Sequence, residues 1–343
     1  MTLKISIVLP THRTGYNAIA RVLECASLDP DKFEVIVRDN SSDDAKRRLL
    51  EQVRAPVLKV LHVPDLGAVE NANSALALAT GDFAFFLADD DWVSSKALIQ
   101  LHEAASANAG DETITLLTGT YLVEVSAGSG FVRYQGIEST DAMERLQGYL
   151  GARGPNVLYY SVIKRSLLTF CLNYVSSLPY KFSFHDQLMV LLYVASGRAL
   201  QVQRVFYHYD QTEWETKEGT LAKDRAWYVK EALPIELDRL HWLICGLEGA
   251  LTLNSTRVAA VAQPDRERLA ALWFATMFER FKRWDRELGW ADTPTNNAAK
   301  RLKEKWVADR EANLHELLFD VCDVIETADK PGAQRYFDFW SSA

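Results

Sequence analysis

Gly81-Asp82-Phe83-Ala84-Phe85-Phe86-Leu87-Ala88-Asp89-Asp90-Asp91-Trp92 is the stretch of sequence that decides the fold. Its apolar run, 83–88, is short and rich in aromatic residues, which predicts a buried β-strand rather than a helix. Three carboxylates follow at once, Asp89, Asp90 and Asp91. Because ligands bind outside the carboxyl ends of the strands in an α/β sheet, these acids mark a candidate site.

The three acids carry an electrostatic cost that indicates a cation. If the backbone stays extended, Asp89 and Asp91 point to one side and Asp90 to the other. Carboxylates this close repel by roughly 3–4 kcal/mol at an effective dielectric of about 20. A hard divalent cation, shared with a substrate diphosphate, would offset the repulsion. The alternative is a solvated acidic turn that caps a helix beginning near Ser94.

Composition restricts the class of protein. The 343 residues are 48% hydrophobic, enough for one large domain or two modest ones. The net charge of −8 argues against binding to nucleic acid, because phosphate contacts need clustered Lys and Arg. The four cysteines are scattered, which fits a reducing cytoplasm. We expect no signal peptide, and no apolar run approaches the roughly 18 residues of a membrane span.

Strands and helices alternate along the first part of the chain. Apolar β-branched runs predict strands, and apolar residues at helical spacing predict the segments between them. The expected strands are 5–9, 33–37, 57–63 and 83–88, and the expected helices are 17–27, 45–53 and 67–79. This order predicts an α/β fold with a mostly parallel sheet and helices on both faces. Fainter strands follow at 113–125 and 200–209, and the spacing is helical from residue 223 onward.

Two further strand ends carry polar groups suited to a nucleotide. Asp39 follows the second strand and could accept a hydrogen bond from the N3–H of uracil or thymine. Thr11 follows the first strand and could hold the base from the other side, while Asn40 lies next to Asp39. The alternative for Asp39 is an ordinary turn acid.

Taken together, these residues resemble the family 2 glycosyltransferases, which have the Rossmann-like GT-A fold. The resemblance rests on Ile7-Val8-Leu9-Pro10-Thr11, Arg38-Asp39-Asn40-Ser41-Ser42-Asp43, the helix from Gly67 to Asn73, Gly81-Asp82-Phe83, and Leu87-Ala88-Asp89-Asp90-Asp91. It implies a nucleotide-diphosphate sugar donor, a Mg²⁺ or Mn²⁺ ion, and inversion at the anomeric carbon. Where many members carry Arg in the second helix, this chain has Ala72.

The resemblance also implies which residues meet the donor and the metal. Asp89 and Asp91 form a DXD motif that holds the metal, and His208 is expected as a third ligand, with a half-buried strand histidine as the alternative. The residues placed at the nucleotide sugar are Pro10, Thr11, Arg13, Asp39, Asn40, Gly67, Asn71, Asn73, Asp89 and Asp90.

A catalytic base is implied as well. Family members carry an acidic pair before a helix like the one expected from residue 188, and here the pair reads His185-Asp186. Asp186 is expected to accept the proton of the acceptor hydroxyl as that hydroxyl attacks C1 of the sugar. The alternative for Asp186 is a helix N-cap. His185, Asn156 and Trp214 are placed on the acceptor side.

The predicted organisation is a nucleotide-sugar-binding and catalytic domain over 1–222 and an α-helical region over 223–343. The helices are expected to cover the sheet, with a dimer interface or a membrane-surface helix near a lipid-linked acceptor as alternatives. The predicted activity is metal-dependent transfer of a hexose from a UDP-sugar to a glycan or lipid-linked acceptor. We expect it to act in surface polysaccharide or glycoconjugate synthesis, in the cytoplasm or at the inner membrane face. The alternative functions are a sugar nucleotidyltransferase and a non-catalytic nucleotide-sugar-binding protein.

Overall fold

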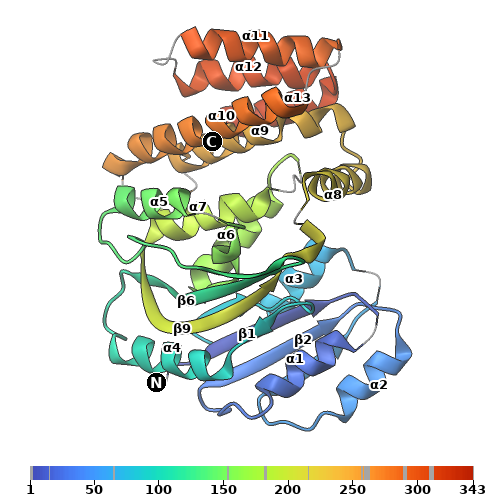
Figure 1. Cartoon of the computed structure of the whole chain (residues 1–343), viewed down its shortest axis with the longest axis vertical. Coiled ribbons are helices and arrows are strands. Elements are labelled where there is room, and N and C mark those ends of the chain that lie inside the picture. The colour runs from blue at the N-terminus through green and yellow to red at the C-terminus, as the bar shows by residue number, and fades with distance from the viewer. Residues whose placement is uncertain are drawn as a thin grey trace. The chain divides into compact units, whose positions relative to one another are not determined.

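The chain forms two compact units (Figure 1). The computed structural model describes residues 3–14, 16–64, 66–152, 154–180, 184–214, 216–255, 258, 263–288, 292–308 and 313–342. Unit 1 comprises Met1–Tyr174 and Ser196–Glu215, and unit 2 comprises Val175–Ala195 and Thr216–Ala343. The sequence predicts a single passage between domains at residue 222, whereas the chain passes between these units three times.

The first half of the sheet in unit 1 is parallel. β1 (Ile5–Thr11) pairs with β2 (Phe33–Asp39) and β4 (Phe83–Phe86), and β2 pairs with β3 (Leu58–His62). The register sets Thr11 opposite Asp39, so two polar residues end neighbouring strands at one edge. β1, β2 and β4 are buried along almost their whole length, as expected for central parallel strands.

The second half of the sheet is mixed. β8 (Val162–Lys164) pairs antiparallel with β4 and with β6 (Ile114–Val125), and β6 runs parallel to β9 (Arg198–Asp210). β5 (Trp92–Val93) pairs antiparallel with β9, and β7 (Gly128–Val132) pairs with β6. Among the described residues the nine strands form one sheet, with the order β3-β2-β1-β4-β8-β6-β9-β5 and β7 beside β6. Figure 1 shows β6 and β9 as long, curved strands lying side by side.

The helices of unit 1 begin where the sequence places capping residues. Asp43 accepts hydrogen bonds from the N–H groups of the first turn of α2, and Ser94 does the same for α4. The Glu70 side chain accepts from the N–H of Gly67 at 2.9 Å, just before α3. The helices are α1 (Asn17–Cys25), α2 (Asp44–Gln52), α3 (Ala68–Leu76), α4 (Ser95–Ala107), α5 (Ala142–Gly151) and α6 (Arg165–Ser176), with short 3₁₀ turns η1 (Val157–Tyr160) and η2 (Thr212–Trp214).

Unit 2 is helical, as the apolar spacing predicts. Its elements are α7 (His185–Ser196), α8 (Lys217–Lys230), η3 (Ile235–Leu240), α9 (His241–Asn254), α10 (Gln263–Leu288), α11 (Pro294–Ala308), α12 (Leu314–Glu326) and α13 (Lys330–Ser341). α9 packs against α10, where the fully buried Trp273 donates to the carbonyl oxygen of Cys245 at 3.0 Å. None of the helices among the described residues combines the length and apolar character that crossing a bilayer requires.

Glu248 is a buried acid in the core of unit 2. It is 0% exposed, and neither carboxylate oxygen has a hydrogen-bond partner among the described residues. Burial raises the pKa of Glu248 well above its usual value. The folded chain therefore keeps a proton that the unfolded chain releases above about pH 4.3. The free energy of unfolding should then fall by up to about 1.4 kcal/mol per pH unit above that point, until the folded-state pKa is reached.

We expect Glu248→Gln to remove this loss of stability, because glutamine has a similar shape and does not ionise. The gain in melting temperature over the wild type should be larger at about pH 8 than at about pH 5, as followed by circular dichroism. Glu236→Gln changes an exposed glutamate of η3 and should leave the pH dependence as it is. The same pH dependence in wild type and Glu248→Gln would contradict a protonated Glu248.

Candidate active site

The three acids lie in a tight, largely buried turn. β4 ends at Phe86, and the chain turns through Asp89 and Asp90 instead of staying extended. Asp89 is 6% exposed and Asp91 is 2% exposed. The alternative of a solvated acidic cap does not describe this turn, because Ser94 caps α4 and two of the three acids, Asp89 and Asp91, are buried.

Asp91 is held by β9. The hydroxyl of Tyr207 donates to Asp91 Oδ2 at 2.9 Å, and the N–H of Asp210 donates to Asp91 Oδ1 at 2.9 Å. Burial raises the pKa of Asp91 to about 7, and the negative charge of Asp90 adds to the rise. The two hydrogen bonds lower the pKa but do not outweigh burial. Near neutral pH this carboxyl is partly protonated, so a cation that binds it has to displace the proton.

Two arginines offset the negative charge of the turn. Arg13 Nη2 lies 2.8 Å from Asp90 Oδ2, and Arg13 Nε lies 3.6 Å from Asp89 Oδ1. Arg21 of α1 stacks on Trp92, with its guanidinium carbon 3.2 Å from the ring centroid, and donates to the carbonyl oxygen of Asp90 at 3.4 Å. The repulsion expected from the sequence is thus partly balanced by the cations of the protein itself.

A pocket of about 300 Å³ opens beside the acidic turn, at the carboxyl ends of β1 and β4. Pro10 and Arg13 line it together with the three acids, as the sequence predicts. Trp214, which is 40% exposed, also lines it. Its other aromatic side chains include Phe86, Tyr159, Tyr160 and Tyr209. The pocket therefore combines carboxylates, a guanidinium group and aromatic faces.

Asp39 is enclosed rather than open to the pocket. It is 0% exposed, and Lys46 Nζ lies 3.0 Å from its Oδ1. The N–H of Ser41 donates to the same oxygen at 3.1 Å, and His62 Nδ1 lies 3.2 Å from Oδ2. Burial alone would raise the pKa of Asp39, but the hydrogen bonds from Lys46 and Ser41 outweigh it and lower the pKa. These three partners hold the carboxylate in this structure, and the nucleobase contact of Asp39 stays a prediction.

Thr11 connects this buried pair to the acidic turn. Its hydroxyl donates to Asp89 Oδ2 at 2.5 Å and accepts from Lys46 Nζ at 2.7 Å. Thr11 is 0% exposed, so it acts on the pocket through Asp89.

The residues predicted around α3 fasten the helix more than they line the pocket. Asn71 is 2% exposed, and its Nδ2 donates to the carbonyl oxygen of Arg38 at 3.2 Å. Ala72 is the residue of α3 that lines the pocket. Its side chain is uncharged, so the positively charged side chain at the pocket is that of Arg13. The residues predicted at the nucleotide sugar that do not line the pocket are Thr11, Asp39, Asn40, Gly67, Asn71 and Asn73.

His208, the predicted third metal ligand, has another partner in this structure, and its metal role stays a prediction. Its Nε2 lies 2.8 Å from Glu124 Oε2, and the residue lines a different cavity, next to Trp92. No three His, Cys, Asp or Glu side chains converge into a ready-made metal site within the described part of the chain. The acid that β9 does bring to the pocket is Asp210, whose pKa is lowered by hydrogen bonds from the side chain and N–H of Thr212.

The acceptor-side predictions divide between the units. Asn156 accepts from the hydroxyl of Tyr149 at 2.9 Å and does not line the pocket. His185 and Asp186 open α7 in unit 2, with Asp186 in the first turn as the sequence predicts. The roles of His185 and Asp186 stay predictions.

Sequence reasoning did not single out Tyr159, Tyr160, Tyr209 and Asp210, which line the pocket, or Lys46, which holds residues beside it. Tyr160 stacks on Tyr207 with ring centroids 4.8 Å apart, which ties the aromatic lining to the tyrosine that holds Asp91. The adjacent pair Tyr159-Tyr160 was a usable signal, since both residues lie just after Asn156, which the sequence places on the acceptor side. Lys46 gave no signal, because a lysine in the first turn of an amphipathic helix is usually solvated.

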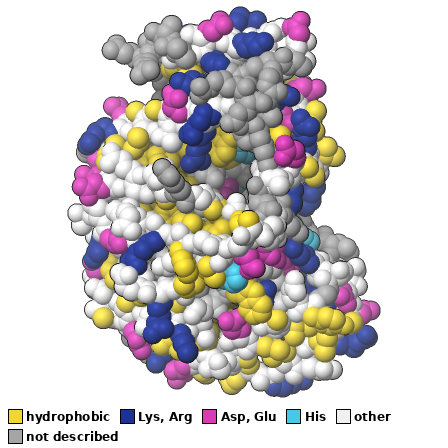
Figure 2. Space-filling view, in the orientation of Figure 1, with side chains coloured by type: hydrophobic (Ala, Val, Ile, Leu, Met, Phe, Trp, Pro, Cys, Tyr) yellow, Lys and Arg dark blue, Asp and Glu magenta, His cyan; other side chains and the backbone are white. Residues whose placement is uncertain are grey.

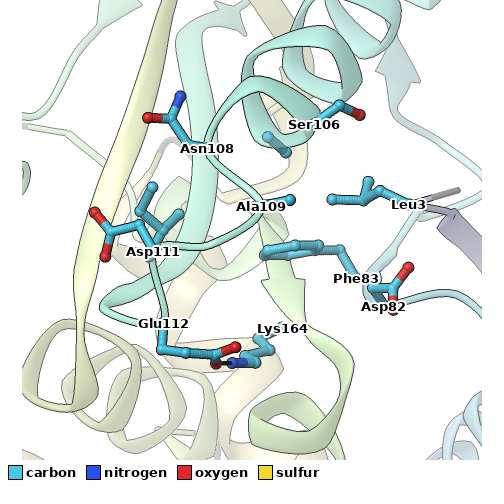
Figure 3. A pocket seen from close by; sticks show the side chains of 11 residues that line it. Leu3, Asp82, Phe83, Ser106, Asn108, Ala109, Asp111, Glu112 and Lys164 are labelled. Atoms are coloured by element: carbon cyan, nitrogen blue, oxygen red, sulfur yellow. Dashed lines mark hydrogen bonds and ion pairs between the residues drawn. The ribbon is translucent and has the colours of Figure 1, made fainter. Parts of the chain in front are cut away.

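Another hollow, of about 350 Å³, lies at the opposite, amino end of β4 (Figure 3). Its charged side chains are paired within the protein. Lys164 pairs with Glu112, and Asp111 lies 2.5 Å from Arg198. Figure 2 shows Lys and Arg scattered among Asp and Glu on one face of the described residues. The pocket at the acidic turn is therefore the better candidate site.

Comparison with known proteins agrees with this geometry. Residues 6–116 match the sequence family described as Glycosyl transferase family 2. A segment of 127 residues is 27% identical to the poly(ribitol-phosphate) beta-glucosyltransferase of Bacillus spizizenii, covering 34% of this chain and 19% of that protein. A segment of 109 residues is 30% identical to the uncharacterized glycosyltransferase YfnE of Bacillus subtilis, covering 31% of this chain and 28% of that protein. The chain thus spans less than a third of either relative.

Solved structures extend the likeness to almost the whole chain. S. aureus TarS 1-349 superposes with a TM-score of 0.51 at 17% identity, covering 98% of this chain and 89% of that one. The same protein in complex with UDP-GlcNAc gives a TM-score of 0.54 at 15% identity, with the same coverage. At this identity the likeness shows the fold. The match over residues 6–116 places that segment in the family described as Glycosyl transferase family 2, and the likeness to TarS supports a GT-A fold for the chain.

Proposed function

We propose that the chain is an inverting glycosyltransferase that moves a sugar from a UDP-sugar to an acceptor hydroxyl. The observation that carries the proposal is the pocket where Arg13 and the acids Asp89, Asp90 and Asp91 meet at the carboxyl ends of parallel strands. This is the edge where α/β sheets bind nucleotides. The complex of TarS with UDP-GlcNAc supports a UDP-sugar as the donor.

The chemistry of the acidic turn fits a hard divalent cation. Asp89 and Asp91 offer carboxylate oxygens, the ligands that Mg²⁺ and Mn²⁺ prefer. Burial and the negative charge of Asp90 raise the pKa of Asp91, and a cation bound beside it would favour its charged form. Mg²⁺ is often held by one or two carboxylates plus substrate phosphates, so a complete set of protein ligands is not required. Such an ion supplies charge neutralisation on the leaving diphosphate.

The side chains of the pocket would bind and orient the donor. The planar guanidinium of Arg13 suits phosphate oxygens, and it already sits beside the acids. Tyr159, Tyr160 and Trp214 offer ring faces on which a nucleobase or a sugar can stack. Donor binding is therefore assigned to unit 1.

Asp186 would act as the general base of transfer. It would accept the proton of the acceptor hydroxyl while that oxygen bonds to C1 and the bond from C1 to the diphosphate breaks. Attack from the side opposite the leaving group inverts the anomeric carbon. The proposed acceptor is a glycan or lipid-linked glycan of a surface polysaccharide. A relative named for poly(ribitol-phosphate) supports a hydroxyl-rich polymer in this role.

A donor screen tests the proposal directly. We expect the protein to release UDP from a UDP-sugar with Mn²⁺ or Mg²⁺, and to do so far more slowly with EDTA or with GDP- and dTDP-sugars. Pyrophosphate release from a nucleoside triphosphate and a sugar phosphate would instead indicate a nucleotidyltransferase. Tight UDP-sugar binding without turnover, in the presence of candidate polyol and glycan acceptors, would indicate a binding protein.

A further inference from the structure

Lys46 is a fully buried cation beside the candidate site. It lies in the first turn of α2 and is 0% exposed. Lysine is almost never fully buried unless its ammonium group is paired. Its three N–H donors have three acceptors here: Asp39 Oδ1 at 3.0 Å, Thr11 Oγ1 at 2.7 Å and the carbonyl oxygen of Arg13 at 2.8 Å.

Two of these three hydrogen bonds lead to the pocket. The pair with Asp39 would balance the charge of the lysine by itself. Thr11 links Lys46 to the acidic turn, because its hydroxyl donates to Asp89 Oδ2 at 2.5 Å. Arg13, whose backbone the lysine holds, reaches the acidic turn with its side chain. The buried ammonium group of Lys46 therefore makes hydrogen bonds to the ends of β1 and β2 and to the turn that follows β1.

The lysine also fixes the direction of the Thr11 hydroxyl. A hydroxyl has one hydrogen and two lone pairs. Since Lys46 Nζ donates to Thr11 Oγ1, the hydrogen of that hydroxyl is left to point at Asp89 Oδ2. Asp89 Oδ1 is then left on the side of Arg13, which lines the pocket.

We propose that Lys46 is a positioning residue for donor and cation binding. It holds Thr11, and through Thr11 it orients Asp89, while it also holds the backbone of Arg13. The inference rests on the proposed function, in which Asp89 and Arg13 meet a cation and a diphosphate. Residues that orient a metal ligand through a hydrogen bond typically contribute about 10- to 100-fold to metal affinity.

The informative comparison is between Asp39→Asn and the double variant Asp39→Asn/Lys46→Met. Lys46→Met alone leaves the Asp39 carboxylate buried without its partner, so that variant can fail to fold. The double variant carries neither charge. Mn²⁺ binding is measured by electron paramagnetic resonance of the free ion in the presence of UDP, and UDP binding by calorimetry. We expect the double variant to bind Mn²⁺ about 10- to 100-fold more weakly than Asp39→Asn does.

Thr11→Val tests the same route with the buried ion pair intact. It should weaken Mn²⁺ binding to a similar degree, because Asp89 loses the hydroxyl that orients it. The triple variant Thr11→Val/Asp39→Asn/Lys46→Met is then compared with the double variant Thr11→Val/Asp39→Asn. The triple variant should bind Mn²⁺ no more than about twofold more weakly.

Lys59→Met is the matched control. Lys59 pairs with another buried carboxylate, with its Nζ 2.7 Å from Glu34 Oε2, so Lys59→Met is made together with Glu34→Gln, and this double variant should bind Mn²⁺ as Glu34→Gln does. If Asp39→Asn and Asp39→Asn/Lys46→Met bind Mn²⁺ equally well, Lys46 only neutralises Asp39. That result overturns the role of Lys46 and leaves the proposed function standing. A wild-type protein that binds no Mn²⁺ with UDP overturns the proposed function, and this inference with it.

Discussion

Replacing Asp89 by Asn should lower kcat/KM for UDP release by about 100- to 1000-fold, because a charge that stabilises the transition state is lost. Asparagine keeps an oxygen that can accept from the Thr11 hydroxyl, which now donates to Asp89 at 2.5 Å. The turn should therefore keep its shape. The loss should appear as weaker Mn²⁺ dependence and slower turnover, with a melting temperature close to that of the wild type.

Asp82→Asn is the control for this result. Asp82 lies at the amino end of the same strand, lines the hollow in Figure 3 and accepts from the N–H of Lys4 at 2.9 Å. It should leave UDP release unchanged, because it is remote from the acidic turn. Wild-type turnover and wild-type Mn²⁺ dependence in Asp89→Asn would remove Asp89 from the site.

Replacing Asp186 by Asn should lower transfer by about 100- to 10,000-fold, the usual contribution of a general base. UDP affinity should stay at the wild-type level, because donor binding is assigned to the pocket of unit 1. Transfer to the acceptor is measured by UDP release with acceptor present, and UDP affinity is measured by calorimetry.

Glu316→Gln is the matched control, since Glu316 also lies in the first turn of a helix in unit 2 and is exposed. It should change neither transfer nor UDP binding. Loss of UDP binding in Asp186→Asn would give Asp186 a structural role in place of catalysis. Unchanged transfer would exclude it as the base.

The elements of the first half of the fold could be predicted because their signals are local. An apolar run ending in three acids predicted a strand over 83–88, which the structure has at Phe83–Phe86, and placed the candidate site at its carboxyl end, where Asp89 lies. Asp43 and Ser94 are capping residues that set where helices begin, so α2 and α4 were also visible in the sequence. The pairing of β6 with β9 was not, because it joins residues far apart in the chain.

Side-chain partners were harder to predict than elements. His208 lies between Tyr207 and Tyr209 on β9. Spacing alone does not show that its imidazole contacts Glu124 of the neighbouring strand β6. Asp39 ends a strand as expected, yet Lys46 from the next helix occupies it. In both cases the deciding partner comes from another element, which periodicity does not encode.

The hydrogen bonds that hold Asp91 join residues 116 and 119 positions apart. Contacts of such long range form only after a large loop has closed. During synthesis, a nascent chain that has just emerged past residue 116 already carries every motif of the matched family segment. It still lacks Tyr207 and Asp210, so the ribosome must deliver β9 before the acidic turn can be completed.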